Sequence, residues 1–298
     1  KAVAFAVLVL MLLFFSIFAP NFAAWNNMVN IMQATAVNGV LGVAVSFVII
    51  SGGIDLAVGT MMTLTAVMSG IMLTNLGLPL PFGILGALGS GAAFGAVSGI
   101  AVAKLKIPPF IATLGMMQIT RGLALVISGA KPIYFNDTPS YQYLSPESSI
   151  SLIIPGLEIP NGVFIMFIVA IIAAIILNRT LLGRYIFALG SNEEAARLSG
   201  MNVDFWKLVT YALSGCIAGV AGLLISSRLN SAQPALGLGY ELDAIAAVVI
   251  GGTSLSGGRG TILGTIIGAF VMSVLTNGLR IMGVQEEWKS VVTGVIII

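Results

Sequence analysis

Residue types that usually carry chemistry are scarce in this chain of 298 residues. It contains no His and a single Cys, Cys216. These counts exclude a disulfide framework and a His/Cys zinc site, and no His is present to activate a Ser or Cys nucleophile. We therefore predict no catalytic residue, no metal site and no cofactor bound by the chain itself, so an intramembrane enzyme is the least favoured reading.

One short motif resembles a nucleotide-binding signature. Leu255–Arg259 reads LSGGR, close to the LSGGQ signature of ABC ATPases, which binds nucleotide only beside a Walker A loop. The sequence has no G-x-x-x-x-G-K-[ST] motif and no soluble domain to hold one. We interpret the match as coincidence and expect no ATP hydrolysis by this chain.

The same stretch belongs to a repeated glycine pattern. Gly251-Gly252-x-x-Leu255-x-x-Gly258 has the spacing of Gly52-Gly53-x-x-Leu56-x-x-Gly59. Transporters often build their pathway from interrupted helices in corresponding parts of two repeats, although a chance match is the alternative in a chain with 36 glycines. We predict interrupted helices at both breaks, near the cytoplasmic ends of spans that run in the same direction.

Two charged residues lie closest to the apolar segments. Asp55 either caps a helix that starts at Leu56 or shapes an inner gate beside the glycine break. Arg121 either contacts carbonyl groups or snorkels to an interface, or it lines a pathway. Further candidates for lining a pathway are the polar residues Gln33, Asn38, Gln118 and Asn277.

The elements that position these residues are expected to be membrane helices. Apolar residues make up 58% of the chain and charged residues 8%, against about 25% charged in soluble domains. The mean hydropathy is +1.06, and a net charge of +2 offers no basic field for nucleic acid. We predict a single all-α domain over residues 1–298, a polytopic helix bundle in a lipid bilayer.

Ten apolar segments are candidate spans, since about 20 apolar residues cross the hydrocarbon core. The weakest are the eighth, which is short and runs into glycines, and the tenth, which is too short to cross. The segments are Ala2–Ala19, Ala34–Ile50, Leu56–Thr74, Phe82–Ala103, Phe110–Gly129, Val163–Asn178, Leu208–Ser227, Ala244–Gly257, Thr261–Met282 and Trp288–Ile298.

The distribution of Lys and Arg predicts that both termini lie in the cytoplasm. Eight basic residues then face inside and four lie at outer ends. The eight are Lys1, Lys104, Lys106, Arg179, Arg184, Arg197, Lys207 and Arg259. Two long loops remain. Residues 130–162 would be external, either a docking surface or a tether, and residues 179–207 would be cytoplasmic.

The cytoplasmic loop predicts a short helix. Ser191 or Asn192 can cap its N-terminus, Glu193 and Glu194 occupy its first turn, and Gly200 can end it. Glu194-Ala195-Ala196, followed after three residues by Gly200, resembles the EAA loop of permease subunits in bacterial ABC importers. No Leu-Pro pair follows Gly200, which departs from the general pattern. The alternative is a helix that merely connects two spans.

The resemblance extends along nearly the whole chain. The matching stretches are Gly52–Gly59 (GGIDLAVG), Gly183–Gly190 (GRYIFALG), Ser231–Pro234 (SAQP), Gly239–Val249 (GYELDAIAAVV), Gly251–Leu255 (GGTSL) and Gly264–Ala269 (GTIIGA). Together they resemble the branched-chain amino acid and monosaccharide permease family of ABC importers, and within it the ribose-importing permeases.

This resemblance implies a permease dimer in the bacterial plasma (inner) membrane that imports a monosaccharide. It also implies a cytoplasmic ATPase, separate or fused in pairs, that uses ATP and Mg²⁺, and an extracytoplasmic sugar-binding protein. The implied contact with the ATPase comprises Glu193, Glu194, Ala195, Ala196, Arg197 and Gly200. Arg197 is expected to pair with an acid of that subunit.

The alternative from another class is an ion-coupled secondary transporter of a small polar solute. It would need several intramembrane carboxylates, and only Asp55 qualifies in the sequence. Residues expected at the outer face are either docking residues for the binding protein or an ordinary polar loop in which Asp243 caps a helix over Ala244–Gly257. They are Gln233, Pro234, Tyr240, Glu241 and Asp243.

Overall fold

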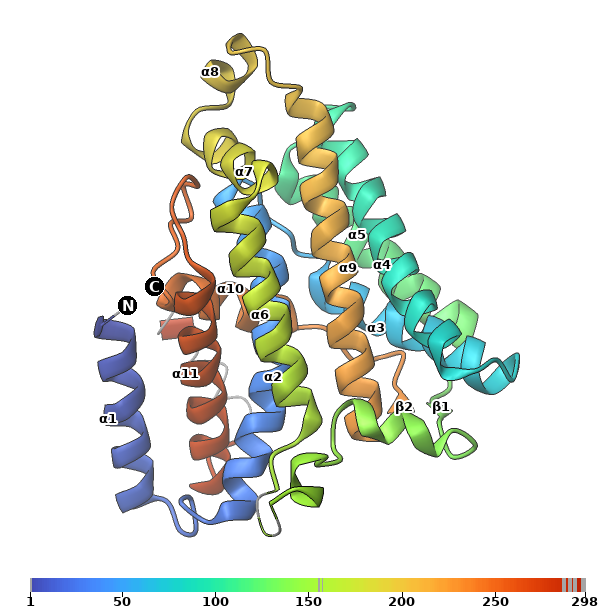
Figure 1. Cartoon of the computed structure of the whole chain (residues 1–298), viewed down its shortest axis with the longest axis vertical. Helices are drawn as coiled ribbons and strands as arrows, with labels where there is room; N and C mark the ends of the chain where they lie inside the picture. Colours follow the sequence, from blue (N-terminus) through green and yellow to red (C-terminus); the bar gives the residue numbers. More distant parts are fainter. Residues whose placement is uncertain are drawn as a thin grey trace.

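Long apolar segments fold into helices that run side by side along one axis (Figure 1). The structure is a computed structural model that describes residues 2–154, 156, 158–285, 288, 291, 294 and 295. The α-helices are α1 (Ala2–Phe18), α2 (Trp25–Ile50), α3 (Val58–Gly70), α4 (Leu80–Ala103), α5 (Pro109–Ser128), α6 (Asn161–Arg179), α7 (Leu181–Ser191), α8 (Glu193–Leu198), α9 (Val203–Leu229), α10 (Tyr240–Ile250) and α11 (Ile262–Ile281).

Seven helices in the described part are long and apolar enough to cross a membrane: α2, α3 with its π-helical continuation Ile71–Asn75, α4, α5, α6, α9 and α11. Helix α1 is shorter, with 17 residues. The prediction of an all-α membrane bundle is confirmed. Most of the tenth predicted span, Trp288–Ile298, lies outside the described residues, and the number of spans and their orientation stay predictions.

Helix α10 differs from the predicted span Ala244–Gly257. It begins four residues earlier, at Tyr240, and ends at Ile250, before the glycine pair. Its 11 residues reach about 16 Å, too short to cross alone. A non-helical stretch, residues 233–239, leads into it. The eighth predicted span is therefore a half-helix preceded by a segment of turns, and this supports the expected interruption of helices at glycine-rich segments.

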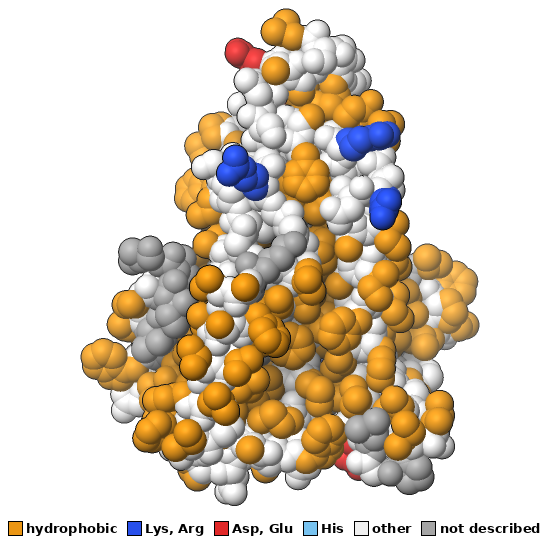
Figure 2. Space-filling model, turned by 60° about the vertical axis from the view of Figure 1, so that its left-hand side comes forward, with side chains coloured by type: hydrophobic (Ala, Val, Ile, Leu, Met, Phe, Trp, Pro, Cys, Tyr) orange, Lys and Arg blue, Asp and Glu red, His pale blue; other side chains and the backbone are white. Residues whose placement is uncertain are grey.

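The interior of the bundle lies around α2 and α9. Side chains such as Val40, Phe47 and Leu224 are fully buried in the largest apolar cluster. On the outside, apolar side chains cover most of the face below α8, and the Lys and Arg side chains visible there lie nearer the α8 end (Figure 2). This distribution is typical of a protein embedded in a bilayer.

Glycines bring α4 against α9. A Cβ atom at Gly91 would overlap the backbone carbonyl of Gly215, and one at Gly95 would overlap that of Tyr211. Further along, a Cβ at Gly99 would lie 2.7 Å from the Cα of Leu208. Such close approach of two helix backbones depends on small residues spaced four apart along one face.

The long loop at residues 130–162 packs on the end of the bundle opposite α8 (Figure 1). Its strand β1 (Ile133–Tyr134) pairs antiparallel with β2 (Ser231–Ala232), just after α9. The Phe135 and Tyr141 rings stack with centroids 4.0 Å apart. The Tyr141 hydroxyl hydrogen-bonds Ser226 at 2.8 Å, and burial raises the pKa of Tyr141 to about 12. This part of the loop is therefore anchored to α9, which argues against a loose tether.

Candidate functional site

Helix α8 projects beyond the other helices at one end of the molecule (Figure 1). As predicted, the Asn192 side chain caps it, because Oδ1 accepts a hydrogen bond from the Ala195 N–H at 2.9 Å. Glu193 and Glu194 lie in its first turn. Gly200 follows with φ of +85°, a left-handed conformation that suits glycine. The local sequence signals are thus sufficient to form this short helix.

The two sides of α8 differ in environment. Ala196 is buried and packs in a cluster with Leu189 and Val203. Glu194 and Ala195 are exposed. Leu198 is 89% exposed at the end of the helix. The sequence analysis missed Leu198, although a Leu at the end of a short polar helix is itself a signal for a contact.

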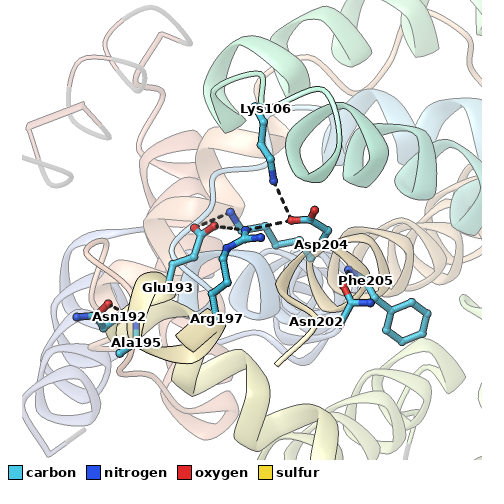
Figure 3. A network of polar contacts seen from close by, with 9 residues as sticks. Lys106, Asn192, Glu193, Ala195, Arg197, Asn202, Asp204 and Phe205 are labelled. Carbon is cyan, nitrogen blue, oxygen red and sulfur yellow. Dashed lines mark hydrogen bonds and ion pairs between the residues drawn. The ribbon is translucent and has the colours of Figure 1, made fainter. Parts of the chain in front are cut away.

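Ion pairs join α8 to α9 and, through α9, to the segment that follows α4 (Figure 3). Glu193 contacts Lys207 at 2.6 Å and Arg197 at 3.5 Å. Arg197 also contacts Asp204 at 3.1 Å, and Asp204 contacts Lys106 at 2.8 Å. Asp204 and Lys207 belong to α9, and Lys106 follows α4. The network therefore links the ends of α4 and α9 to α8.

Arg197 pairs with acids of its own chain, and its pairing with an acid of another subunit stays a prediction. Hydrogen bonding to Asp204, followed by Glu193, raises the pKa of the Arg197 guanidinium. A single exposed ion pair contributes little to the free energy of unfolding. A network of ion pairs that share charged groups restricts the relative movement of the segments it joins more than a single pair does. In this structure Arg197 positions α8 on its own scaffold.

The two glycine breaks meet beside the start of this loop. The Gly258 N–H donates to the carbonyl of Ile50 at 2.9 Å. A Cβ at Gly190 would overlap that same Ile50 carbonyl. Gly52 and Gly252 both have positive φ, +82° and +89°. The breaks thus lie at the same end of the bundle, and the chain leading into α8 contacts their backbone directly.

Asp55 lies buried between α2 and α3. One carboxylate oxygen accepts from the Ala57 N–H and the other from the Ser214 hydroxyl, both at 3.0 Å. Helix α3 begins at Val58, with Ala57 at the N-cap position. The expected cap of a helix at Leu56 is therefore wrong in position: Asp55 stabilises the turn before the helix and ties it to α9.

Half-helix α10 starts against the first turn of α3. A Cβ at Gly59 would overlap the Gly237 carbonyl and lie 2.7 Å from Oε2 of Glu241. Glu241 is only 7% exposed, and both its carboxylate oxygens accept from the Gly239 N–H at 3.1 Å. Glu241 thus lies buried in the first turn of α10, and its placement at the outer face stays a prediction. Asp243 likewise lies within the first turn and is not the cap.

The other predicted lining residues separate into two places. Gln118 and Arg121 are exposed on α5. On the same helix, a Cβ at Gly115 or Gly122 would meet no atom within 4 Å. Ile111, Ile119 and Val126 are also exposed on α5, so Gln118 and Arg121 interrupt an otherwise apolar surface of this helix. Gln33 lies on α2, apart from both groups and partly exposed.

Asn38 and Asn277 instead line a cavity of about 790 Å³, together with Tyr240 and Asp243. Its wall comes from α2, the end of α9, the start of α10 and α11. The polar side chains that line it are Asn27, Asn30, Asn38, Arg228, Tyr240, Asp243, Ser273, Thr276, Asn277 and Arg280. The fold thus brings together residues that the sequence analysis assigned to separate roles.

A bundle of apolar helices with two helix interruptions in contact and a projecting loop helix defines a multi-pass membrane transport subunit. The chain belongs to the branched-chain amino acid transport system / permease component family, whose model matches residues 27–298. It is thus an ABC importer permease of the bacterial inner membrane and not an enzyme. Such a permease works with an ATPase and a binding protein.

Curated relatives cover almost the whole chain. The ribose import permease protein RbsC of Escherichia coli K12 is 44% identical over 283 residues, 95% of this chain and 87% of the relative. RbsC of Bacillus subtilis 168 is 39% identical over 295 residues, 99% of this chain and 89% of the relative. The fructose import permease protein FrcC of Rhizobium meliloti is 38% identical over 304 residues, 100% of this chain and 83% of the relative. No solved structure matches.

Proposed function

We propose that the chain is the membrane-spanning subunit of an ATP-driven monosaccharide importer, with ribose as the foremost substrate. Identity of 44% and 39% to two ribose import permeases supports this substrate. The observation that carries the mechanism is the placement of α8, which projects from the bundle and is tied by ion pairs to α9 and to the chain after α4.

We infer that the α8 end faces the cytoplasm, where the ATPase binds. The basic residues Lys106, Arg197 and Lys207 lie in its ion-pair network, as the positive-inside rule requires. Glu194, Ala195, Leu198 and Gly200 are the residues that α8 offers to a partner. Ala196 and Glu193 instead hold α8 to the rest of the chain, Ala196 through apolar contacts and Glu193 through an ion pair with Lys207.

ATP-driven closure of the ATPases would then move α8 as a unit. The ion pairs pass this movement to α9, and Gly190 passes it to the glycine breaks at residues 52–59 and 251–258. A change in these breaks alternates access to the pathway between the two sides of the membrane.

A second copy of the chain is proposed to cover α5. An exposed Arg or Gln in hydrocarbon is costly, so such side chains usually face protein or water. Gly115 and Gly122 leave room for a close helix contact on the same face. Gln118 and Arg121 would then border a pathway between the two copies.

The proposed function is tested with the purified complex of permease, ATPase and binding protein. Ribose-loaded binding protein should raise the rate of ATP hydrolysis severalfold over binding protein without sugar. Xylose and fructose serve as competing sugars. No stimulation by any of the three, in a complex that stays assembled, would contradict the assignment as a sugar permease.

A further inference from the structure

Helix α6 has two faces of different composition. The small residues Gly162, Ala170 and Ala173 are buried against the bundle. On the opposite face, four isoleucines at helical spacing are each more than half exposed: Ile168, Ile171, Ile172 and Ile175. Membrane helices that pack against one another meet at small residues. The isoleucine stripe, which contains none, therefore faces lipid.

Arg179, the last residue of α6, continues this isoleucine stripe. It follows Ile175 by four residues and Ile168 by eleven, spacings that return to the same side of a helix. Its side chain is exposed, and α6 ends on the side of the bundle that carries α8 (Figure 1). Because an Arg within hydrocarbon is costly, this guanidinium lies where the lipid tails give way to headgroups.

Helix α7 packs closely on the end of α6. The hydroxyl of Thr180, between the two helices, accepts from the Gly183 N–H at 3.4 Å. A Cβ at Gly183 would overlap a carbonyl in the last turn of α6. The outward face of α7 begins with Leu181 and Arg184, both exposed and three residues apart. The junction of α6 and α7 therefore presents two arginines with an apolar side chain between them.

Arg179 and Arg184 carry charges that no acid neutralises within the part of the chain that the structure describes. The ion pairs near α8 instead occupy Glu193 and Asp204, whose partners are Lys106, Arg197 and Lys207. A guanidinium matches the geometry of a phosphate group and can donate two parallel hydrogen bonds to it. The junction thus suits a phosphate that comes from outside the chain.

We propose that Arg179 and Arg184 bind the headgroup phosphate of an anionic phospholipid, whose acyl chains lie along the isoleucine stripe of α6. Both parts of a lipid find their complement here: apolar side chains for the tails, and two cations at the end of the stripe for the headgroup. The ATPase fits these arginines less well, because α8 projects beyond α7 (Figure 1) and Arg179 lies on the lipid-facing side of α6.

The site would act on the helix that leads to α8. Gly190, in the last turn of α7, lies against the backbone of Ile50 at the first glycine break. A lipid bound at the first turn of α7 would therefore hold in place a helix whose other end contacts the glycine breaks. The lipid site itself does not depend on the transported solute, so it goes beyond the proposed function.

Native mass spectrometry of the full-length permease, with phosphatidylglycerol or phosphatidylcholine added to the detergent, tests the site. We expect the permease to retain phosphatidylglycerol in preference. Arg179→Gln and Arg184→Gln should each weaken its binding about fivefold and leave the retention of phosphatidylcholine unchanged. Lys104→Gln is the matched control, because Lys104 is exposed after α4 and outside this junction. It should bind phosphatidylglycerol like the parent.

Three outcomes would overturn the site. The first is phosphatidylglycerol binding no stronger than that of phosphatidylcholine, or equal in the parent and the double variant of Arg179 and Arg184. The second is equal weakening by Lys104→Gln, which would show a general attraction to positive charge. The third is loss of ATPase retention by the double variant with unchanged lipid binding, which would assign the arginines to the ATPase.

Thermal unfolding checks that the variants are folded. In phosphatidylcholine, the double variant of Arg179 and Arg184 should unfold at the temperature of the parent, because both side chains are exposed. Added phosphatidylglycerol should raise the unfolding temperature of the parent and not that of the double variant, since a ligand stabilises only the protein that binds it. An equal rise in both would contradict the site. Sugar transport is not part of either measurement, so a failed importer would refute only the proposed function.

Discussion

Replacing Leu198 with Asp should abolish sugar uptake while the permease still inserts into the membrane. Leu198 is 89% exposed at the end of α8, so replacing it should change the stability of the permease itself very little. In the proposed complex it fills an apolar pocket of the ATPase, where a carboxylate would be desolvated. A central contact of this kind is worth about 2 kcal/mol or more, which weakens the complex about 30-fold.

The measurement is retention of the ATPase by the affinity-purified permease, together with uptake. Leu76→Asp is the matched control, because Leu76 is 63% exposed in the short loop between Ile71–Asn75 and α4, away from every proposed contact. Leu198→Met should keep the contact. Normal ATPase retention by Leu198→Asp would remove Leu198 from the interface.

Gly91→Leu should destabilise the fold severely, because a side chain at this position overlaps the backbone of α9 at Gly215. The two helices would have to separate along their whole contact. Overpacking by even a few methylenes typically costs 1–3 kcal/mol, against a total stability of about 5–15 kcal/mol. Displacing a backbone costs more, so the variant should be recovered poorly and unfold at a much lower temperature.

Gly89→Leu supplies the control in the same helix. A Cβ at Gly89 meets no atom within 4 Å, so this variant should express and unfold like the parent. The measurement is thermal unfolding of both variants in one detergent, with expression normalised. Equal unfolding temperatures for the two variants would show that α4 and α9 are not packed as described.

The parts of the fold that could be predicted depend on local signals. Apolar length predicts the membrane helices, and the sequence around Asn192 and Gly200 is sufficient to start and end α8. The residues that form each of these helices, or that start and end it, lie within the helix or a few positions from its ends. The same is true of the glycine breaks, where the positive φ values of Gly52 and Gly252 are conformations that glycine adopts readily.

The features that could not be predicted depend on contacts between distant segments. The start of α10 is set by the approach of Gly237 to Gly59, so its apolar pattern alone placed the helix four residues too late. Arg197 pairs with Asp204 through the fold of the loop between α8 and α9, which no local pattern reveals.

The grouping of the candidate lining residues could not be predicted from the sequence either. Asn38 and Asn277 are far apart in sequence but lie in one cavity wall, whereas Gln118 and Arg121 lie on a different helix face. The sequence analysis selected all four residues because polar and charged side chains are unusual in apolar segments. Only the packing of α2 against α11 shows which pair acts together.

Uptake of radiolabelled ribose by proteoliposomes tests the central claim most directly. The vesicles contain the permease with its ATPase, ATP is supplied on the ATPase side, and binding protein on the opposite side. The account predicts accumulation that requires both ATP hydrolysis and the binding protein, and that is lost in Leu198→Asp but not in Leu76→Asp. Accumulation driven by a proton or sodium gradient, without ATP or binding protein, would contradict it.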